Sequence, residues 1–378
     1  MRSRSLFWLA ILAALMLLVA ACEEDLADEP DPEDLEEDLA DDEPEDEEPE
    51  PEEPDEDEVD PDAENIDWGT SDVGSAGHAA LVSLADVMNR EWDDYSITVQ
   101  PTGGAVQTVI GYAIDGEFDG IYGADVAFSE MAEDRDRFEG FSDDAEQVPV
   151  QSFWAYPMET GLAINADNAD EFQEWGDLEG EPVFTGPAPW DVRANLEAAM
   201  DALDVGHDYV EVDTGVAGDS LDGGEISGMI AYTTSELDPA PWVVEAELQT
   251  DMQILNPSDD EVAALDDAGY EVVGVDPGGF EGDVGVDEAM FVPFFYGFHL
   301  GMEYDADTVY EKLDLIAEHA EDLAAANEAF SVLADDPAEL QARGVAASID
   351  DIEVHPGMAE WMDDQGVWDD AWDDRIAE

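Results

Sequence analysis

The chain has 378 residues, of which 103 are Asp or Glu, only 9 are Lys or Arg, and one is cysteine. This charge excludes nucleic acid as a partner, because there is no basic patch to replace the counterions of a phosphate backbone. The single cysteine excludes an internal disulfide. Hydrophobic residues make up 44% of the chain, which is enough for one large or two medium α/β units.

The first 22 residues have the pattern of an export signal. Arg2 and Arg4 precede an apolar run of 16 residues from Leu6 to Ala21, which is shorter than the roughly 18–20 residues that cross a bilayer as a helix. The run ends in Leu18-Val19-Ala20-Ala21-Cys22, which resembles the lipobox of bacterial lipoproteins. The resemblance implies lipidation at Cys22 and membrane anchoring outside the cytoplasm, in the periplasm or on the outer cell surface. The alternative is an ordinary signal peptide with an incidental cysteine.

Residues 23–64 are an acidic segment, with 28 Asp or Glu in 42 positions and repeated proline. A segment with so few large apolar side chains cannot offset its ordering entropy, so we expect a disordered tether. Fully extended, it would reach roughly 140 Å.

The remaining residues, 65–378, carry 75 acidic and 7 basic side chains, and Lys312 is the only lysine of the chain. In dilute buffer such a charge density opposes compaction, whereas at molar salt the Debye length falls to about 3 Å and the repulsion is screened. The composition therefore predicts a halophilic protein.

Strand-like and helix-like patterns alternate along this part, as is typical of an α/β fold. We expect strands at 66–69, 96–100, 120–127, 150–165, 182–185, 228–233 and 290–300, helices at 78–92, 106–115 and 191–203, and two helices within 305–343. The long aromatic-rich runs at 150–165 and 290–300 are interpreted as paired crossings between two lobes. Lobe 1 would comprise 65–155 and 295–378, and lobe 2 would comprise 156–294.

Seven short motifs occur in a characteristic order between Asp67 and Trp368. They are Gly69-Thr70-Ser71 followed by Gly74 and Gly77; Thr102-Gly103-Gly104-Ala105; Gly123-Ala124-Asp125-Val126-Ala127; Leu178-Glu179-Gly180-Glu181-Pro182-Val183; Pro277-Gly278-Gly279-Phe280-Glu281-Gly282; Val309-Tyr310; and His355-Pro356-Gly357 followed by Gly366-Val367-Trp368. Together they resemble the TAXI-family solute receptors of TRAP transporters, with Glu181 in place of the usual lysine.

The resemblance implies a two-lobed fold like that of type II periplasmic binding proteins, with a ligand cleft between the lobes. It also implies a binding protein with no enzymatic activity and no cofactor. Its ligand would be a small organic acid such as glutamate or a related dicarboxylate, which it would deliver to a TRAP-type membrane permease.

The Gly-rich loops are predicted to follow strands and to open helices, so that free N–H groups and positive helix ends face one cleft. The structural alternative for any single loop is a tight turn or a helix cap. The candidate ligand-binding residues are Thr70, Ser71, Thr102, Gly103, Gly104, Ala105, Asp125, Trp154, Tyr156, Trp190, Asp191 and Arg193.

The turn at 186–191 departs from the family pattern. Two prolines remove amide donors, and Asp191 adds negative charge at a helix start where we expect an N-cap. Arg193 is expected either to hold a ligand carboxylate or to pair with Asp191 or Glu197. A cationic or aromatic solute remains the alternative ligand, because an aspartate beside aromatic rings suits an ammonium group.

Other residues give little sign of chemistry. The five histidines share no metal-ligand spacing, and no nucleophile elbow or phosphate loop is present. His355 is expected to cap or support the C-terminal helix. A sensory lipoprotein that presents its solute to a membrane kinase is the alternative to transport, and a neighbouring permease or kinase gene would separate the two.

Overall fold

The computed structural model describes residues 63–73, 75–188 and 190–378. The predicted signal peptide, Cys22 and the acidic segment up to residue 62 lie outside the described residues. Within the part that the structure describes, no helix is long and apolar enough to cross a membrane.

One half of the molecule is built on three parallel strands, β1 (Glu64–Thr70), β2 (Tyr95–Pro101) and β3 (Gly120–Ala124). The sheet continues antiparallel from β3 into the long strand β11 (Ala289–Leu300) and then into β4 (Trp154–Asn165), in the order β2-β1-β3-β11-β4. We call this half lobe 1.

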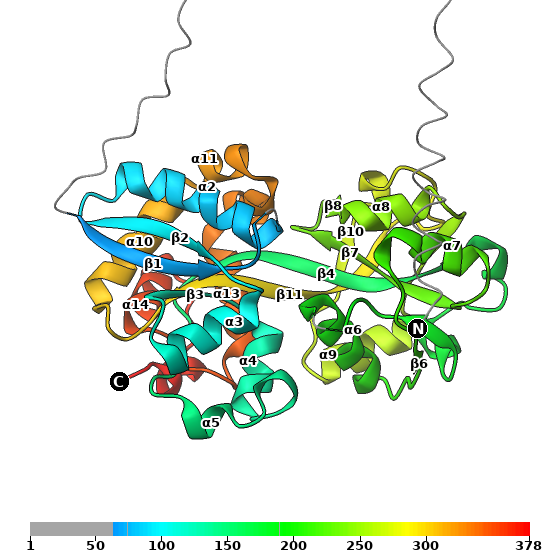
Figure 1. Ribbon diagram of the computed structural model, residues 1–378, viewed down its shortest axis with the longest axis horizontal. Coiled ribbons are helices and arrows are strands. Elements are labelled where there is room, and N and C mark those ends of the chain that lie inside the picture. Colours follow the sequence, from blue (N-terminus) through cyan, green and yellow to red (C-terminus); the bar gives the residue numbers. More distant parts are fainter. Residues whose placement is uncertain (1–62, 74, 189) are drawn as a thin grey trace, which may run out of the picture. The chain divides into compact units, whose positions relative to one another are not determined.

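The second half, lobe 2, repeats the same arrangement. Its parallel strands are β5 (Pro182–Phe184), β6 (Asp208–Tyr209) and β7 (Gly228–Thr234), and the order is β6-β5-β7-β4-β11. In each lobe, therefore, the first of the three parallel strands in the chain lies between the second and the third. The two antiparallel strands that both lobes share lie beside the third. Figure 1 shows β4 and β11 running from one lobe into the other. The predicted two-lobed α/β fold is confirmed.

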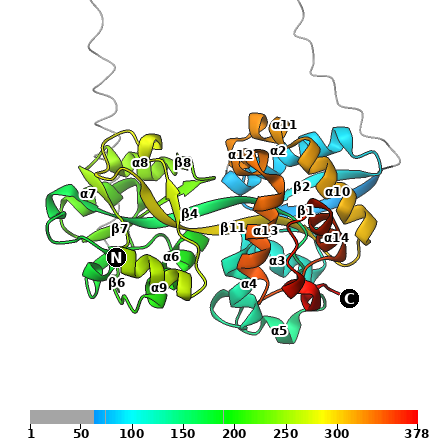
Figure 2. The ribbon, with the colours of Figure 1, turned by 180° about the vertical axis from the view of Figure 1, so that it is seen from behind.

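Helices cover the sheet in both lobes. Those of the described residues are α2 (Ala76–Glu91), α3 (Ala105–Ile110), α4 (Asp125–Ala132), α5 (Phe141–Asp144), α6 (Asp191–Ala202), α7 (Ala217–Asp222), α8 (Pro241–Glu247), α9 (Asp259–Asp267), α10 (Ala306–Glu318), α11 (Ala320–Ala326), α12 (Ser331–Asp335), α13 (Pro337–Ser348) and α14 (Pro356–Gln365). Helices α10 to α14 follow β11 and return to lobe 1 (Figure 2). Three short strands complete the sheet: β8 (Asp238–Pro239) pairs with β7, β9 (Met252–Leu255) with β4, and β10 (Val273–Val275) with β11.

The crossing strands are buried along nearly their whole length, which explains their continuous apolar sequences. Their close packing depends on glycine. A Cβ on Gly161 of β4 would come within 2.2 Å of the Phe291 ring on β11, and a Cβ on Gly344 of α13 would come equally close to the Trp154 ring.

Several predicted boundaries were wrong. The strand predicted at 120–127 ends at Ala124, because Asp125 begins α4. The predicted strand at 150–165 begins only at Trp154. The region 305–343, predicted as two helices, contains α10 to α12 and most of α13. Asp336 caps α13 and Pro337 starts it, so the preceding helix has to stop there. The division into lobes at residues 155 and 294 stays a prediction, and both positions lie within the crossing strands.

Candidate ligand-binding site

The two Gly-rich loops of lobe 1 lie side by side at the carboxyl ends of β1 and β2. The Thr102 hydroxyl donates to the Thr70 carbonyl at 2.7 Å, and the Thr102 amide donates to the same oxygen at 2.9 Å. Each loop opens a helix as predicted: Ser75 caps α2, and Gly104, with φ of 146°, precedes α3. The Oγ of Ser71 lies 2.6 Å from that of Ser75.

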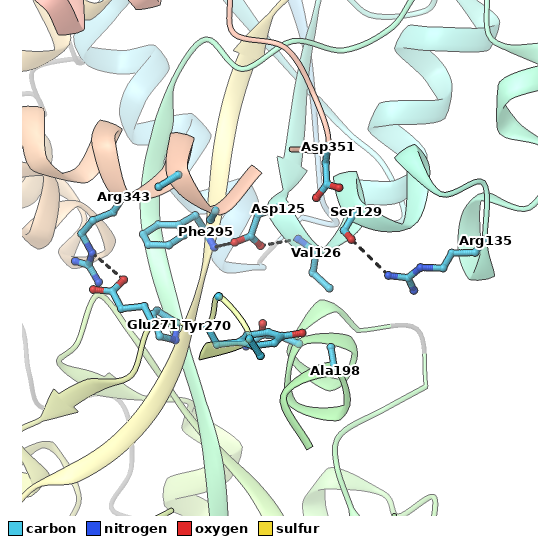
Figure 3. A pocket seen from close by; sticks show the side chains of 16 residues that line it. Asp125, Val126, Ser129, Arg135, Ala198, Tyr270, Glu271, Phe295, Arg343 and Asp351 are labelled. Atoms are coloured by element: carbon cyan, nitrogen blue, oxygen red, sulfur yellow. Dashed lines mark hydrogen bonds and ion pairs between the residues drawn. The ribbon is translucent and has the colours of Figure 1, made fainter. Parts of the chain in front are cut away.

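Both lobes contribute to a cavity of about 450 Å³ (Figure 3). Lobe 1 contributes Asp125, Val126, Ser129, Arg135, Arg343, Ala346, Ala347 and Asp351; β11 contributes Pro293 and Phe295; lobe 2 contributes Asn195, Ala198, Ala268, Gly269, Tyr270 and Glu271. A volume of this size can enclose a small organic solute.

Asp125, the first residue of α4, is the buried carboxyl group of this cavity. Its Oδ1 accepts from the Val126 amide at 2.6 Å, and its Oδ2 accepts from the Phe295 amide at 3.1 Å. Burial raises the pKa of Asp125 to about 8, although these two bonds oppose the shift. Near neutral pH the Asp125 carboxyl is therefore largely protonated and adds little negative charge.

Arg343 on α13 is the cavity residue that connects the lobes most directly. Its Nη1 lies 3.0 Å from Glu236 and its Nε 3.2 Å from Glu271, both in lobe 2. Its Nη2 is buried and has no hydrogen-bond partner among the described residues. Because an unpaired buried N–H is costly, an acceptor that a solute brought within reach of this nitrogen would be stabilised.

Arg135 is the second guanidinium of the cavity. It pairs with Glu133 at 2.5 Å and with Asp136 at 2.6 Å, and all three side chains are substantially exposed. Exposed pairs of this kind contribute little to stability. The Arg135 guanidinium is thus held near the cavity by weak contacts.

A cluster of buried tyrosines lies where β3 meets the crossing strands. The hydroxyls of Tyr122 and Tyr156 are 2.7 Å apart, and the rings of Tyr122 and Tyr296 stack with centroids 4.7 Å apart. The Tyr296 hydroxyl donates to Asp191 at 2.6 Å. Burial raises the pKa of all three phenols, so they remain neutral hydrogen-bond donors.

Asp191 also makes an ion pair across the lobes. Its Oδ1 lies 2.5 Å from Nη1 of Arg137, and the Nε of Arg137 lies 2.6 Å from Glu130 in lobe 1. Asp191 is the first residue of α6 and follows its N-cap, Trp190, so the predicted N-cap position was wrong by one residue.

The structure brings only some of the twelve predicted residues together. Asp125 lines the cavity, and Asp191 is close enough to raise its pKa, while Tyr156 belongs to the tyrosine cluster. Trp190 is 41% exposed. None of the other predicted residues lines the cavity: Thr70, Ser71, Thr102, Gly103, Gly104, Ala105, Trp154, Tyr156, Trp190, Asp191 and Arg193.

Trp154 and Arg193 have structural partners of their own. Trp154 is fully buried in lobe 1, and its Nε1 donates to Gln151 at 3.0 Å. Arg193 donates to Glu197 at 2.9 Å, and its guanidinium carbon lies 3.7 Å from the centroid of the Tyr209 ring. This geometry matches the pairing with Glu197 that the sequence left open. The roles of the twelve residues in ligand binding stay predictions.

Sequence reasoning missed Arg137, Arg343, Tyr122 and Tyr296. The sequence holds one signal that could have pointed to Arg137 and Arg343, because they are two of only seven basic residues after residue 64. His355 was predicted correctly: its Nδ1 accepts from the Gly357 amide at 3.1 Å and caps α14.

No protein-family model and no curated protein matches this sequence. Several solved structures are similar to it. The periplasmic aliphatic sulphonate binding protein of Escherichia coli is 12% identical, with a TM-score of 0.41 over 79% of this chain and 78% of that one. Substrate-binding domain 2 of GlnP from Lactococcus lactis, in an open conformation, is 11% identical, with a TM-score of 0.35 over 72% and 97%. A probable amino-acid ABC transporter extracellular-binding protein from Bacillus subtilis is 10% identical, with a TM-score of 0.39 over 71% and 98%. All three similarities are distant.

Proposed function

We propose that this protein is an extracytoplasmic solute receptor that is anchored to the membrane at Cys22. It captures a small organic solute between its lobes and delivers it to a TRAP-type permease. The observation that carries the proposal is the cavity of about 450 Å³ with walls from both lobes and from β11. Because such a cavity changes when the lobes move, solute binding and lobe closure are coupled.

The chemistry of the cavity wall favours a solute with a carboxylate. Arg343 has a buried nitrogen without a partner among the described residues, and Arg135 is held by exposed ion pairs and by a 3.5 Å hydrogen bond to the Ser129 hydroxyl. The nearby Asp125 is largely protonated near neutral pH, which removes one source of repulsion. These features support the glutamate-like or dicarboxylate ligand that the resemblance to TAXI receptors implies.

A thermal-shift screen of the full chain in multimolar salt tests this assignment. The screen compares amino acids, dicarboxylates and quaternary amines. A solute at about 100 times its Kd stabilises the folded state by about 2.7 kcal/mol, which corresponds to about 4 °C for a domain of this size. We expect a dicarboxylate or an acidic amino acid to give this shift. Stabilisation by quaternary amines alone would contradict the carboxylate assignment, and no shift with any solute would contradict the receptor assignment.

Arg343→Gln is the variant that tests the cavity, and Arg90→Gln is its matched control. Arg90 is an exposed arginine of α2 in the same lobe. We expect Arg343→Gln to reduce the shift from an acidic solute by more than half, while Arg90→Gln retains it. Equal shifts in both variants would show that Arg343 does not contact the solute.

Delivery to a permease rests on the family resemblance and on the tether. It is tested by measuring solute uptake in cells that lack the receptor gene and, separately, in cells that lack a candidate permease gene. Loss of uptake in both deletions supports transport. Unchanged uptake in the receptor deletion would contradict it and favour the sensory role.

A further inference from the structure

The ion pair between Arg137 and Asp191 joins residues that belong to different lobes. Arg137 lies in the short helix Asp136–Phe138, which follows α4 in lobe 1, and the buried Phe138 ring anchors this helix. Asp191 begins α6 in lobe 2. Their charged atoms are 2.5 Å apart, and Asp191 is only 8% exposed.

Glu130 and Asp191, two of the groups that contact Arg137, differ in what a lobe movement would do to the contact. Glu130 lies on α4 of the same lobe, so its contact with Arg137 survives when the lobes separate. The contact with Asp191 joins the two lobes, so a movement that separates them would break it. The carboxylate of Asp191 is therefore paired with Arg137 only when the lobes are together.

Tyr296 orients Asp191 for this contact. Its hydroxyl donates to Oδ2 of Asp191, while Arg137 takes Oδ1. Tyr296 lies on the crossing strand β11, so the carboxylate is held at the junction of the two lobes. A hydrogen bond to each oxygen fixes the orientation of the carboxylate.

The acidic charge of the protein makes a contact between opposite charges stabilising where the two lobes meet. After residue 64 the chain has 75 acidic and 7 basic side chains, so two facing lobes repel each other wherever salt does not screen them. A guanidinium of one lobe that meets a carboxylate of the other offsets this repulsion at the place where the surfaces approach.

We infer that Arg137 and Asp191 form an interlobe latch, which stabilises the closed arrangement of the lobes before any solute binds. Asp191 is then a positioning residue, which acts through Arg137 and is not a ligand contact. Because a receptor binds its solute in proportion to its closed fraction, the latch raises the apparent affinity for every solute by the same factor. Only this effect on solute affinity rests on the proposed function, and the latch itself does not.

The latch can be tested without a solute by measuring the distance between the lobes. Nitroxide labels are placed by Asp143→Cys on α5 and Asp260→Cys on α9, two exposed positions in different lobes. The Cys22→Ala background leaves no other thiol in the chain. Pulsed electron paramagnetic resonance in multimolar salt then reports the populations of short and long distances.

Asp191→Asn is the informative variant, because the amide keeps the shape and the bond from Tyr296 but loses the charge. We expect the ratio of short to long distances to fall roughly tenfold, in keeping with a hydrogen bond between charged groups. Asp201→Asn is the matched control, since Asp201 is an exposed acid of the same helix, and we expect no change. Identical distributions in the two variants would overturn the latch.

Two further variants distinguish the latch from other roles. Arg137→Gln and the double variant Arg137→Gln with Asp191→Asn should open the lobes to the same extent as Asp191→Asn alone, because the pair is broken in all three. If Arg137→Gln does not fold, Asp191→Asn decides the question. A solute screen adds the last criterion: Asp191→Asn should weaken all solutes equally, and a selective loss of cationic solutes would make Asp191 a ligand contact.

Discussion

Glu159, in the middle of crossing strand β4, is a fully buried carboxyl group between the lobes. Its Oε2 accepts from the Thr233 hydroxyl at 2.6 Å and from the Glu236 amide at 3.0 Å. Its Oε1 has no partner among the described residues. Burial raises the pKa of Glu159 from 4.5 to about 8.

The raised pKa makes the stability of the protein depend on pH. Since the folded state holds this proton more tightly than the unfolded state, its contribution is fully present below pH 4.5 and is lost as the pH rises through about 8. One pKa unit corresponds to about 1.4 kcal/mol, so about 3 kcal/mol is lost by pH 7.

Glu159→Gln removes this dependence and keeps the contacts. The amide oxygen can accept both bonds that Oε2 accepts, and the amide nitrogen occupies the position of Oε1. We therefore expect the variant to match the wild type near pH 4.5 and to exceed its free energy of unfolding by about 3 kcal/mol at pH 7. Urea unfolding in multimolar salt, at several pH values between 4.5 and 8, measures the difference.

The wild type and Glu159→Gln share all other titrating groups, so the effects of those groups cancel in the difference between the two free energies of unfolding. Glu245→Gln on α8 is the control, because Glu245 is exposed, and we expect a difference near zero at every pH. If the gain from Glu159→Gln is the same at pH 4.5 and pH 7, the buried carboxyl group is not protonated in the folded state and the reasoning fails.

Three more predictions concern salt, Arg193 and the crossing strands. The protein should be folded in multimolar salt and expanded in dilute buffer; unchanged circular dichroism and hydrodynamic radius at low salt would contradict the halophilic interpretation. Arg193→Ala should lower the free energy of unfolding by about 1–2 kcal/mol, because the contacts with Glu197 and Tyr209 are lost. It should weaken solute binding less than Arg343→Gln does. If calorimetry gives the opposite ranking, Arg193 is a ligand contact. Gly161→Ala should destabilise the protein by about 1–3 kcal/mol, since the new Cβ would overlap Phe291. Gly206→Ala is the control, because there is open space around Gly206. Equal melting temperatures for the two variants would contradict the close packing at Gly161.

Local patterns were sufficient to predict most of the fold. The aromatic runs around Tyr156 and Tyr296 predicted the crossing strands because strands buried on both faces are continuously apolar. The boundary at Asp125 was missed because Val126 and Ala127 extend the apolar pattern of β3 into the first turn of α4. Propensity alone does not show where a buried strand becomes a buried helix.

The site was harder to predict than the fold, because its contacts join distant parts of the chain. Arg137 and Asp191 are 54 residues apart, and Tyr296 lies a further 105 residues beyond Asp191. The Gly-rich loops give local signals, and these correctly placed two strand-to-helix turns. No local signal distinguishes Arg343, which lines the cavity, from Arg193, which packs within lobe 2.

The labelled chain tests whether the two lobes close on a solute, as we propose. The measurement is the distance between the labels on α5 and α9 in multimolar salt, with and without the solute that gives the largest thermal shift. We expect this solute to shorten the distance in the wild type, and we expect Arg343→Gln to need a much higher concentration for the same change. A solute that binds tightly and leaves the distance distribution unchanged would contradict lobe closure.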